Sequence, residues 1–211
     1  MNTYTGDGGP SVGNVFERLM FSIRMGSTEL FFSDRVTSES QILFDRDPHQ
    51  RVRKVAPYLT LDTKAVPAAI DMDGNPDTPK ELVWIIDAYT TSNNYPYSAR
   101  ETLLEATTDA TTIGATGINR PDEINYIRNS VKAVVNAYDG SVTLYQWDAD
   151  DPIINAWKAI FPGQITPLEE MPGDLIAHVR YPEDLFKVQR TLLARYHVTD
   201  AKSFYSGGDF W

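Results

Sequence analysis

Alternation between apolar and polar residues is clearest over residues 131–147, which we expect to form a β-hairpin. Two runs rich in β-branched and aromatic residues flank Asp139-Gly140, a dipeptide that tolerates the positive φ angles of a type I′ turn. Beyond this turn, the side chains of residues 142–147 alternate between the two faces of the second strand. Because an isolated hairpin is only marginally stable in water, we expect further strands or covering helices elsewhere in the chain.

A second pair of strands is predicted over residues 58–72 and 81–89, with the turn-forming sequence DGNPDTPK between them. The run Leu82–Ile86 is continuously apolar, which is typical of a central strand that is covered on both faces. We expect the two hairpins to combine into one antiparallel sheet of about four strands.

Apolar residues at helical spacing lie on both sides of these strands. They predict helices over residues 12–26 and 27–32, a short helix that ends near Leu43, and a long helix over 181–197. Asp47-Pro48 and Asp151-Pro152 each combine an N-cap carboxylate with a proline in the first turn, so we expect a helix to begin at each.

Helices that precede and follow a group of strands indicate the α+β class, with helices covering an antiparallel sheet. We interpret residues 1–211 as one module. Within it, residues 106–123 are rich in Thr, Ala and Gly and show no periodicity. This composition favours a flexible connector.

Composition narrows the choice of partners. The 211-residue chain has 42% hydrophobic and 23% charged residues, an ordinary balance for a globular protein. Its formal net charge of −10 argues against nucleic acid as the main partner, but leaves divalent cations and basic partners open.

Cysteine is absent, which excludes disulfides and thiol nucleophiles within the chain. The most apolar run is much shorter than the about 20 residues that span a bilayer, so we expect the chain by itself to be soluble.

One group of polar and aromatic residues follows the predicted central strand. Aromatic rings beside a carboxylate and hydroxyl groups can form a stacking platform for a sugar or a peptide. The alternative is that the rings close the edge of the sheet and the hydroxyls cap turns. The residues of this candidate ligand site are Asp87, Tyr89, Thr90, Thr91, Tyr95 and Tyr97.

A second candidate is a weak calcium site in the turn between the first two strands. Oxygen-bearing side chains occupy alternate positions there, at Asp71, Asp73, Asn75 and Asp77. An EF-hand loop has glycine at its sixth position and glutamate at its twelfth, whereas here Gly74 is fourth and Glu81 is eleventh. Asp, Asn, Gly and Pro are also the residues that ordinary turns use, so both interpretations stay open.

Motifs for catalysis are not evident. The three histidines, His49, His178 and His197, do not fit a triad pattern, and there is no G-x-S-x-G elbow, zinc signature or phosphate loop. Glu183 and Asp184 open a predicted helix, where acidic residues are favoured by the helix dipole. We therefore assign no catalytic residue and no cofactor, and the pattern favours a non-enzymatic role.

Several long stretches resemble one protein family. IRNSVKAVVNAYDGSVTLYQWD (127–148), VWIIDAYTTSNNYPYS (83–98) and RYPEDLFKVQRTLLARYHV (180–198) are similar to UPF0182 proteins, as are residues 42–59 and 204–211. Members of that family are uncharacterised multi-pass membrane proteins of actinobacteria and some other bacteria. The resemblance implies that this chain is part of a long soluble region outside the cytoplasmic membrane. It implies no site residues, because the family has no established activity.

Two functions are compatible with this resemblance. The first is an extracytoplasmic interaction or binding module of a membrane-anchored envelope protein, with other parts of the parent protein or an envelope component as partners. The alternative is part of a cell-envelope enzyme that acts on glycan or lipid and whose site needs regions outside this stretch. A deep pocket with perturbed carboxylates would favour the enzyme, and a shallow aromatic groove or a flat apolar patch would favour the binding module.

Overall fold

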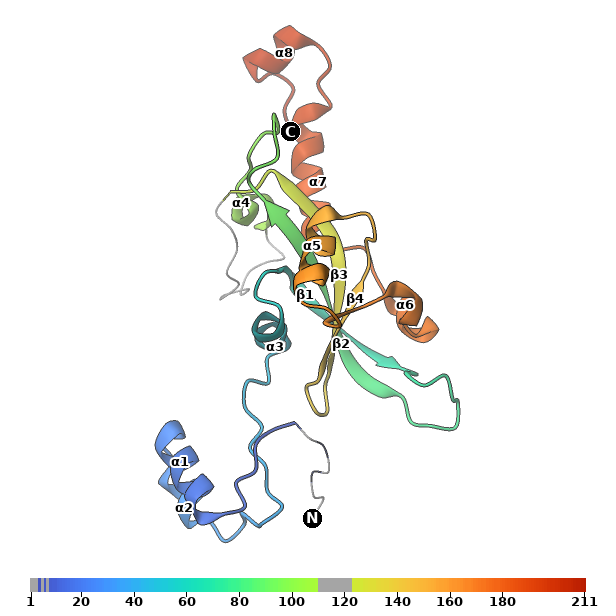
Figure 1. Ribbon diagram of the computed structural model, residues 1–211. Helices are drawn as coiled ribbons and strands as arrows, with labels where there is room; N and C mark the ends of the chain where they lie inside the picture. Colours follow the sequence, from blue (N-terminus) through green and yellow to red (C-terminus); the bar gives the residue numbers. More distant parts are fainter. Residues whose placement is uncertain (1–3, 5, 7, 110–122) are drawn as a thin grey trace.

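A five-stranded sheet forms the centre of an elongated molecule (Figure 1). The structure is a computed structural model that describes residues 4, 6, 8–109 and 123–211. The strands follow the chain in the order β1-β2-β3-β4-β5, and β5 is parallel to β4 whereas the other neighbours are antiparallel. Their bounds are β1 (Thr60–Ile70), β2 (Glu81–Ser92), β3 (Tyr126–Asn136), β4 (Val142–Gln146) and β5 (Ile165–Thr166).

The α+β class is confirmed, but the expectation of about four strands in an antiparallel sheet is wrong. The fifth strand comprises only Ile165–Thr166, and it pairs with Leu144 and Tyr145 of β4. A strand of two residues is too short to produce an alternating pattern in the sequence. Its place in the sheet depends on the chain returning from helix α5 (Pro152–Ile160).

Most of the remaining helices precede or follow the sheet as expected. The remaining helices are α1 (Val15–Met25), α2 (Thr28–Phe32), α3 (Pro48–Val55), α4 (Leu103–Thr107), α6 (Gly173–His178), α7 (Glu183–Tyr196) and α8 (Ala201–Ser206), together with a short 3₁₀ helix at Leu168–Glu170. Helix α4 lies between β2 and β3, and neither α4 nor α6 was predicted. The predicted helix that ends near Leu43 is wrong. Residues 9–12 and 40–42 instead run side by side: Gln41 bridges to Ser11, and the Ile42 amide donates to the Pro10 carbonyl.

The β3–β4 hairpin is confirmed, but its turn is not the predicted two-residue type I′ turn. The Asn136 amide donates to the Ser141 carbonyl at 2.9 Å, so residues 137–140 form the loop. Within that loop only Gly140 has a positive φ, of 75°. The Asn136 Oδ1 atom accepts from the Tyr138 amide at 2.8 Å, which stabilises the longer loop in the manner of an Asx turn.

Apolar residues cover both faces of the sheet, as predicted for the central strand. On one face, Ile86 of β2 lies in a cluster with Val52 of α3 and Ile154 of α5. On the other face, Ile85 packs in a cluster that includes Leu175 of α6. Successive side chains of a strand point to opposite faces, so one continuous apolar run supplies both cores.

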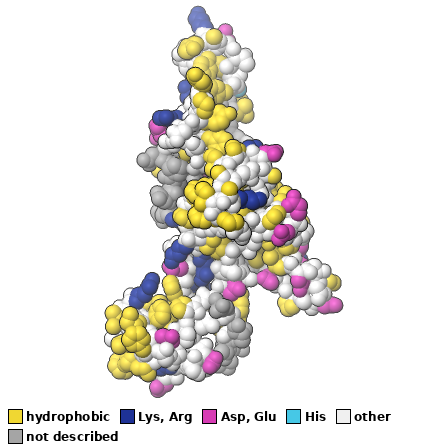
Figure 2. All heavy atoms as spheres, in the orientation of Figure 1, with side chains coloured by type: hydrophobic (Ala, Val, Ile, Leu, Met, Phe, Trp, Pro, Cys, Tyr) yellow, Lys and Arg dark blue, Asp and Glu magenta, His cyan; other side chains and the backbone are white. Residues whose placement is uncertain are grey.

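The two ends of the molecule lie away from the sheet. Helix α7 extends from the sheet towards α8, and its Val188 packs with Leu103 and Ala106 of α4. At the opposite end, α1 and α2 pack on each other (Figure 1). The space-filling view shows apolar side chains gathered over this helical pair (Figure 2). The exposed ones include Val15, Phe16, Met20, Ile23 and Phe32.

The predicted flexible connector begins inside a helix. Ala106 and Thr107 are the last residues of α4, and both are buried. Residues 110–122, which make up most of the predicted connector, lie outside the described residues.

Helix α5 is attached to the sheet through its N-cap, Asp151, which is completely buried. Asp151 Oδ2 accepts from the hydroxyls of Thr90 and Ser130, both at 2.6 Å, and Oδ1 accepts from the Tyr126 hydroxyl at 2.6 Å and the Ile153 amide at 3.1 Å. Burial acts to raise the pKa of this carboxyl, but these hydrogen bonds outweigh burial and place the pKa below its ordinary value.

We predict that Asp151→Ala destabilises the chain by about 3–4 kcal/mol, because it removes both a helix cap and the charged acceptor of the buried Thr90 and Ser130 hydroxyls. The matched control is Asp47→Ala at the start of α3, where the carboxylate accepts from the backbone amides of His49 and Gln50 and lies 3.7 Å from the His49 ring, so the loss should be about 1 kcal/mol. Urea unfolding of both variants measures the difference. Equal losses would contradict the role given to the Thr90 and Ser130 hydrogen bonds.

The same carboxylate predicts a pH dependence. The pKa of Asp151 is lower in the folded chain than its ordinary value of 3.8, so the stability it contributes is fully present above pH 3.8 and is lost as the pH falls below that value. The stability difference between the wild type and Asp151→Ala should therefore shrink in urea titrations at progressively lower pH. A difference that stays constant down to pH 3 would exclude this linkage.

Candidate functional site

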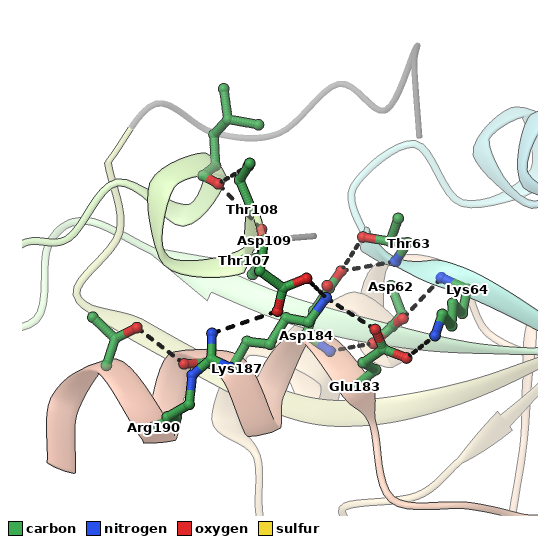
Figure 3. A network of polar contacts seen from close by, with 12 residues as sticks. Asp62, Thr63, Lys64, Thr107, Thr108, Asp109, Glu183, Asp184, Lys187 and Arg190 are labelled. Atoms are coloured by element: carbon green, nitrogen blue, oxygen red, sulfur yellow. Dashed lines mark hydrogen bonds and ion pairs between the residues drawn. The ribbon is translucent and has the colours of Figure 1, made fainter. Parts of the chain in front are cut away.

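A buried polar network connects β1 with the first turn of α7 (Figure 3). Asp62 of β1 is 2% exposed. Its Oδ1 atom accepts from the Lys64 amide at 2.9 Å, and its Oδ2 atom accepts from the Tyr89 hydroxyl and from the Asp184 amide, the latter at 2.9 Å. Burial and the adjacent Asp62 carboxylate both raise the pKa of Tyr89, so the phenol stays protonated and donates.

Asp184 completes the contact in the reverse direction. Its Oδ2 atom accepts from both the amide and the hydroxyl of Thr63, each at 2.7 Å. The N-cap of α7 is Pro182, whose side chain makes no capping hydrogen bond. An amide in the first turn of a helix needs an acceptor from outside the helix, and Asp62 supplies it. The two aspartates therefore hold the start of α7 against β1.

Ion pairs extend this network to the end of α4 (Figure 3). Lys187 of α7 is 3% exposed and contacts Glu183 at 2.9 Å and Asp109 at 3.2 Å. Burial lowers the pKa of Lys187, but the hydrogen bonds to Glu183 and Asp109 outweigh it and raise the pKa above its ordinary value. Asp109 also contacts Arg190 at 3.5 Å. These groups are held in mutual contacts, which indicates a structural role.

A second buried ion pair lies on the same face of the sheet, between Asp87 of β2 and Lys132 of β3, which are directly opposite in the strand register. Lys132 is 1% exposed, and its Nζ atom lies 4.8 Å from the centroid of the Trp147 ring. Burial raises the pKa of Asp87 although Lys132 acts to lower it, and burial lowers the pKa of Lys132 although Asp87 acts to raise it.

Beside this pair lies the buried side-chain amide of Asn129. Its nitrogen and its oxygen are both buried, and neither makes a hydrogen bond of normal geometry with a described residue. The amide is nevertheless close enough to Asp87 to oppose the rise in the pKa of that carboxyl that burial causes. A buried polar group without a partner is uncommon in folded proteins, but both amide atoms of Asn129 are buried, so they lie beneath the accessible surface of the site.

Asn129 and Lys132 line an open cleft of about 740 Å³. Trp147 and the loop that follows β4 form one wall, and the opposite wall is the segment from the end of α6 into α7, which includes Tyr181 and Gln189. The Tyr181 hydroxyl donates to Gln189 Oε1 at 2.6 Å, which fixes the position of the tyrosine ring. Because Asp62 and Asp184 hold the start of α7 on the sheet, they also fix the separation of these walls.

The structure separates the residues of the predicted ligand platform. Asp87 and Tyr89 point to the α7 side of the sheet, where Asp87 bonds Lys132 and Tyr89 bonds Asp62. Thr90 points to the opposite face and bonds Asp151. The Thr91 hydroxyl contacts that of Thr60 at 3.1 Å. Asp87 is thus the one member of the set that adjoins the cleft, through Lys132.

The two remaining members of that set lie in the loop after β2. Tyr95 stacks on Tyr126 with ring centroids 5.9 Å apart, and the Tyr97 side chain is fully exposed. Ligand binding by these tyrosines stays a prediction. Sequence reasoning missed Lys132 and Asn129, although a lysine inside the apolar run VKAVV is an unusual residue for a covered strand.

The candidate calcium residues lie in the β1–β2 turn and bond the backbone of that turn. Oδ1 atoms of Asp71, Asp73 and Asn75 accept from the amides of Gly74, Asn75 and Asp77, respectively. The hydrogen bond from the Asn75 amide lowers the pKa of Asp73. Within the described residues, no group of three or more His, Asp or Glu side chains is arranged to hold a metal ion. Calcium binding stays an untested prediction.

Comparison with known proteins identifies the family. A model described as "Uncharacterised protein family (UPF0182)" matches residues 1–211. The chain belongs to the UPF0182 family. UPF0182 proteins of Bifidobacterium longum and Kocuria rhizophila are each 56% identical to it, over 100% and 99% of this chain but only 19% and 20% of their own lengths. One from Clavibacter michiganensis is 47% identical over 99% of this chain and 20% of its own length.

This UPF0182 chain thus spans about a fifth of the length of the curated relatives it matches. No solved structure is significantly similar to it. In the part of the chain that the structure describes, no helix is both long enough and apolar enough to cross a membrane.

The Asp87–Lys132 pair predicts a double-mutant result. Lys132→Met should destabilise the UPF0182 chain by about 3–5 kcal/mol, because it leaves the buried Asp87 without its counter-ion. The double variant Asp87→Leu/Lys132→Met removes both charges and should be more stable than Lys132→Met alone. Urea unfolding of the variants measures both effects. A double variant that is no more stable than Lys132→Met would contradict a coupled ion pair.

Proposed function

We propose that this chain is an interaction module of a membrane-anchored UPF0182 envelope protein. The module lies outside the cytoplasm and contacts another part of the parent protein or an envelope component. The observation that carries the proposal is the open cleft of about 740 Å³ beside α7, whose lining combines Trp147 and Tyr181 with the exposed side chains of Arg180 and Asp150. Aromatic rings combined with a few polar groups in a preformed hollow are typical of binding sites. Membrane anchoring and location rest on the resemblance to the family.

Fixed contacts of the buried acidic groups support binding rather than catalysis. Asp62 accepts from Tyr89, Asp184 accepts from Thr63, and Asp87 is paired with Lys132. A general base must be within reach of the proton that it removes, and these carboxylates are already engaged below the surface.

An envelope enzyme is the second candidate, and one observation favours it. Burial shifts the pKa of Asp87 upwards and that of Lys132 downwards, and Lys132 lines the cleft. Perturbed groups of this kind are concentrated at catalytic sites, although structural ion pairs produce them too. In this alternative, regions of the parent protein outside this chain would complete the site.

Cysteine labelling tests the location. The chain has no cysteine, so Tyr97→Cys, at a fully exposed position, introduces one reporter into the full-length parent with any other cysteines replaced. A membrane-impermeant maleimide should label Tyr97→Cys on intact cells. Val83→Cys, at a position that is 1% exposed, is the unlabelled control. Labelling of Tyr97→Cys only after the cells are opened would place the module in the cytoplasm and refute the proposed location.

Cross-linking tests the cleft as the contact surface. Gln189 is exposed on α7 and lines the cleft, so a photoreactive benzoylphenylalanine at this position should form an adduct in intact cells that carry the full-length parent. The control is the same residue at Tyr205, which is 89% exposed on α8, away from the cleft. Adducts at both positions, or at neither, would argue against the cleft as a specific contact site.

A further inference from the structure

The charges that line the cleft are balanced. Two cations are already paired with acids: Lys132 with Asp87, and Arg128 with Asp148 at 2.8 Å. Two further charged side chains, those of Arg180 and Asp150, also line the cleft and are exposed. Balanced charge gives little net field, so neither an anion nor a cation is favoured over a neutral ligand.

Donors and acceptors of hydrogen bonds are also mixed in the cleft. The Arg180 guanidinium offers only donors and the Asp150 carboxylate only acceptors. A hydroxyl group both donates and accepts, so a ligand with several adjacent hydroxyls can satisfy both side chains.

Aromatic rings supply the apolar part of the cleft. Trp147 is half-buried, with the Lys132 ammonium 4.8 Å from its ring centroid, and Tyr181 is held by its hydrogen bond to Gln189. Such rings combine a large apolar surface with a polar edge. A purely apolar ligand would cover the exposed Arg180 and Asp150 side chains without bonding them, at a cost in affinity.

We propose that the cleft binds a neutral, polyhydroxylated ring, as in the sugar units of a glycan. The ring lies against Trp147 and Tyr181, and its hydroxyls bond the exposed side chains of Arg180 and Asp150 at the rim. This inference rests on the proposed function, in which the cleft is the contact site, and it specifies the chemical class of the envelope component that the cleft contacts.

Isothermal titration calorimetry tests the ligand class. The probes are trisaccharides of glucose, mannose and N-acetylglucosamine, with inorganic phosphate as the anionic comparison. At least one trisaccharide should bind, and Asp150→Ala and Arg180→Ala should each weaken it by about tenfold or more, since each removes a charged hydrogen-bonding group. The control Tyr205→Ala should bind as the wild type does. Urea unfolding confirms that all variants are folded.

Four outcomes would overturn the inference. Phosphate binding that depends on Arg180, without trisaccharide binding, would show an anion site in the same cleft and leave the proposed contact site standing. Trisaccharide binding that is lost in Tyr95→Ala or Tyr97→Ala, but kept in Asp150→Ala, would place the sugar on the loop after β2. Trisaccharide binding that none of these changes affects would place it elsewhere. Binding of no trisaccharide would refute the ligand class, whereas labelling and cross-linking in cells decide the proposed function separately.

Discussion

The reciprocal hydrogen bonds between Asp62 and Asp184 fix the position of α7 on the sheet. The Asp62 carboxylate accepts a hydrogen bond from the amide of Asp184, and the Asp184 carboxylate accepts hydrogen bonds from the amide and the hydroxyl of Thr63. Both carboxylates are nearly fully buried, where hydrogen bonds are strong and an unpartnered polar group is costly. A shift of α7 along β1 would break all of these contacts together, so the helix has one favourable position.

Other features depend on that position. Lys187, one turn further along α7, reaches Asp109 and so connects the end of α4 to α7, while Val188 closes the apolar contact with Leu103. The segment just before α7 forms a wall of the cleft. The network is therefore structural in its contacts, and it also sets the width of the candidate site.

The Asp87–Lys132 pair imposes a further constraint, on strand register. Val131 and Ala133 point into the core beneath α3 and α5, and Lys132 between them points to the other face. A slip of one residue in β3 would turn Lys132 into that apolar core. A buried ion pair contributes little net stability, but it penalises the wrong pairing and holds Lys132 at the base of the cleft.

Local patterns in the sequence determined the elements whose signals lie within a few residues. The N-caps Asp47 and Asp151, each followed by proline, begin helices as expected, because a cap bonds amides only two or three residues away. The apolar run in β2 likewise predicted a strand covered on both faces. The length of the β3–β4 loop escaped prediction, since the Asn136 side chain, rather than Asp139-Gly140 alone, stabilises it.

Only the tertiary structure shows which residues come together in the candidate site. Asp62 and Asp184 are 122 positions apart, and nothing near either residue indicates the other. Asp87, Tyr89 and Thr90 looked like one exposed group in the sequence, but strand alternation sends Thr90 to the opposite face and α7 covers Asp62, the partner of Tyr89. Local sequence specifies hydrogen bonds that close within a turn, whereas a cleft between β3, β4 and α7 exists only after distant segments have packed.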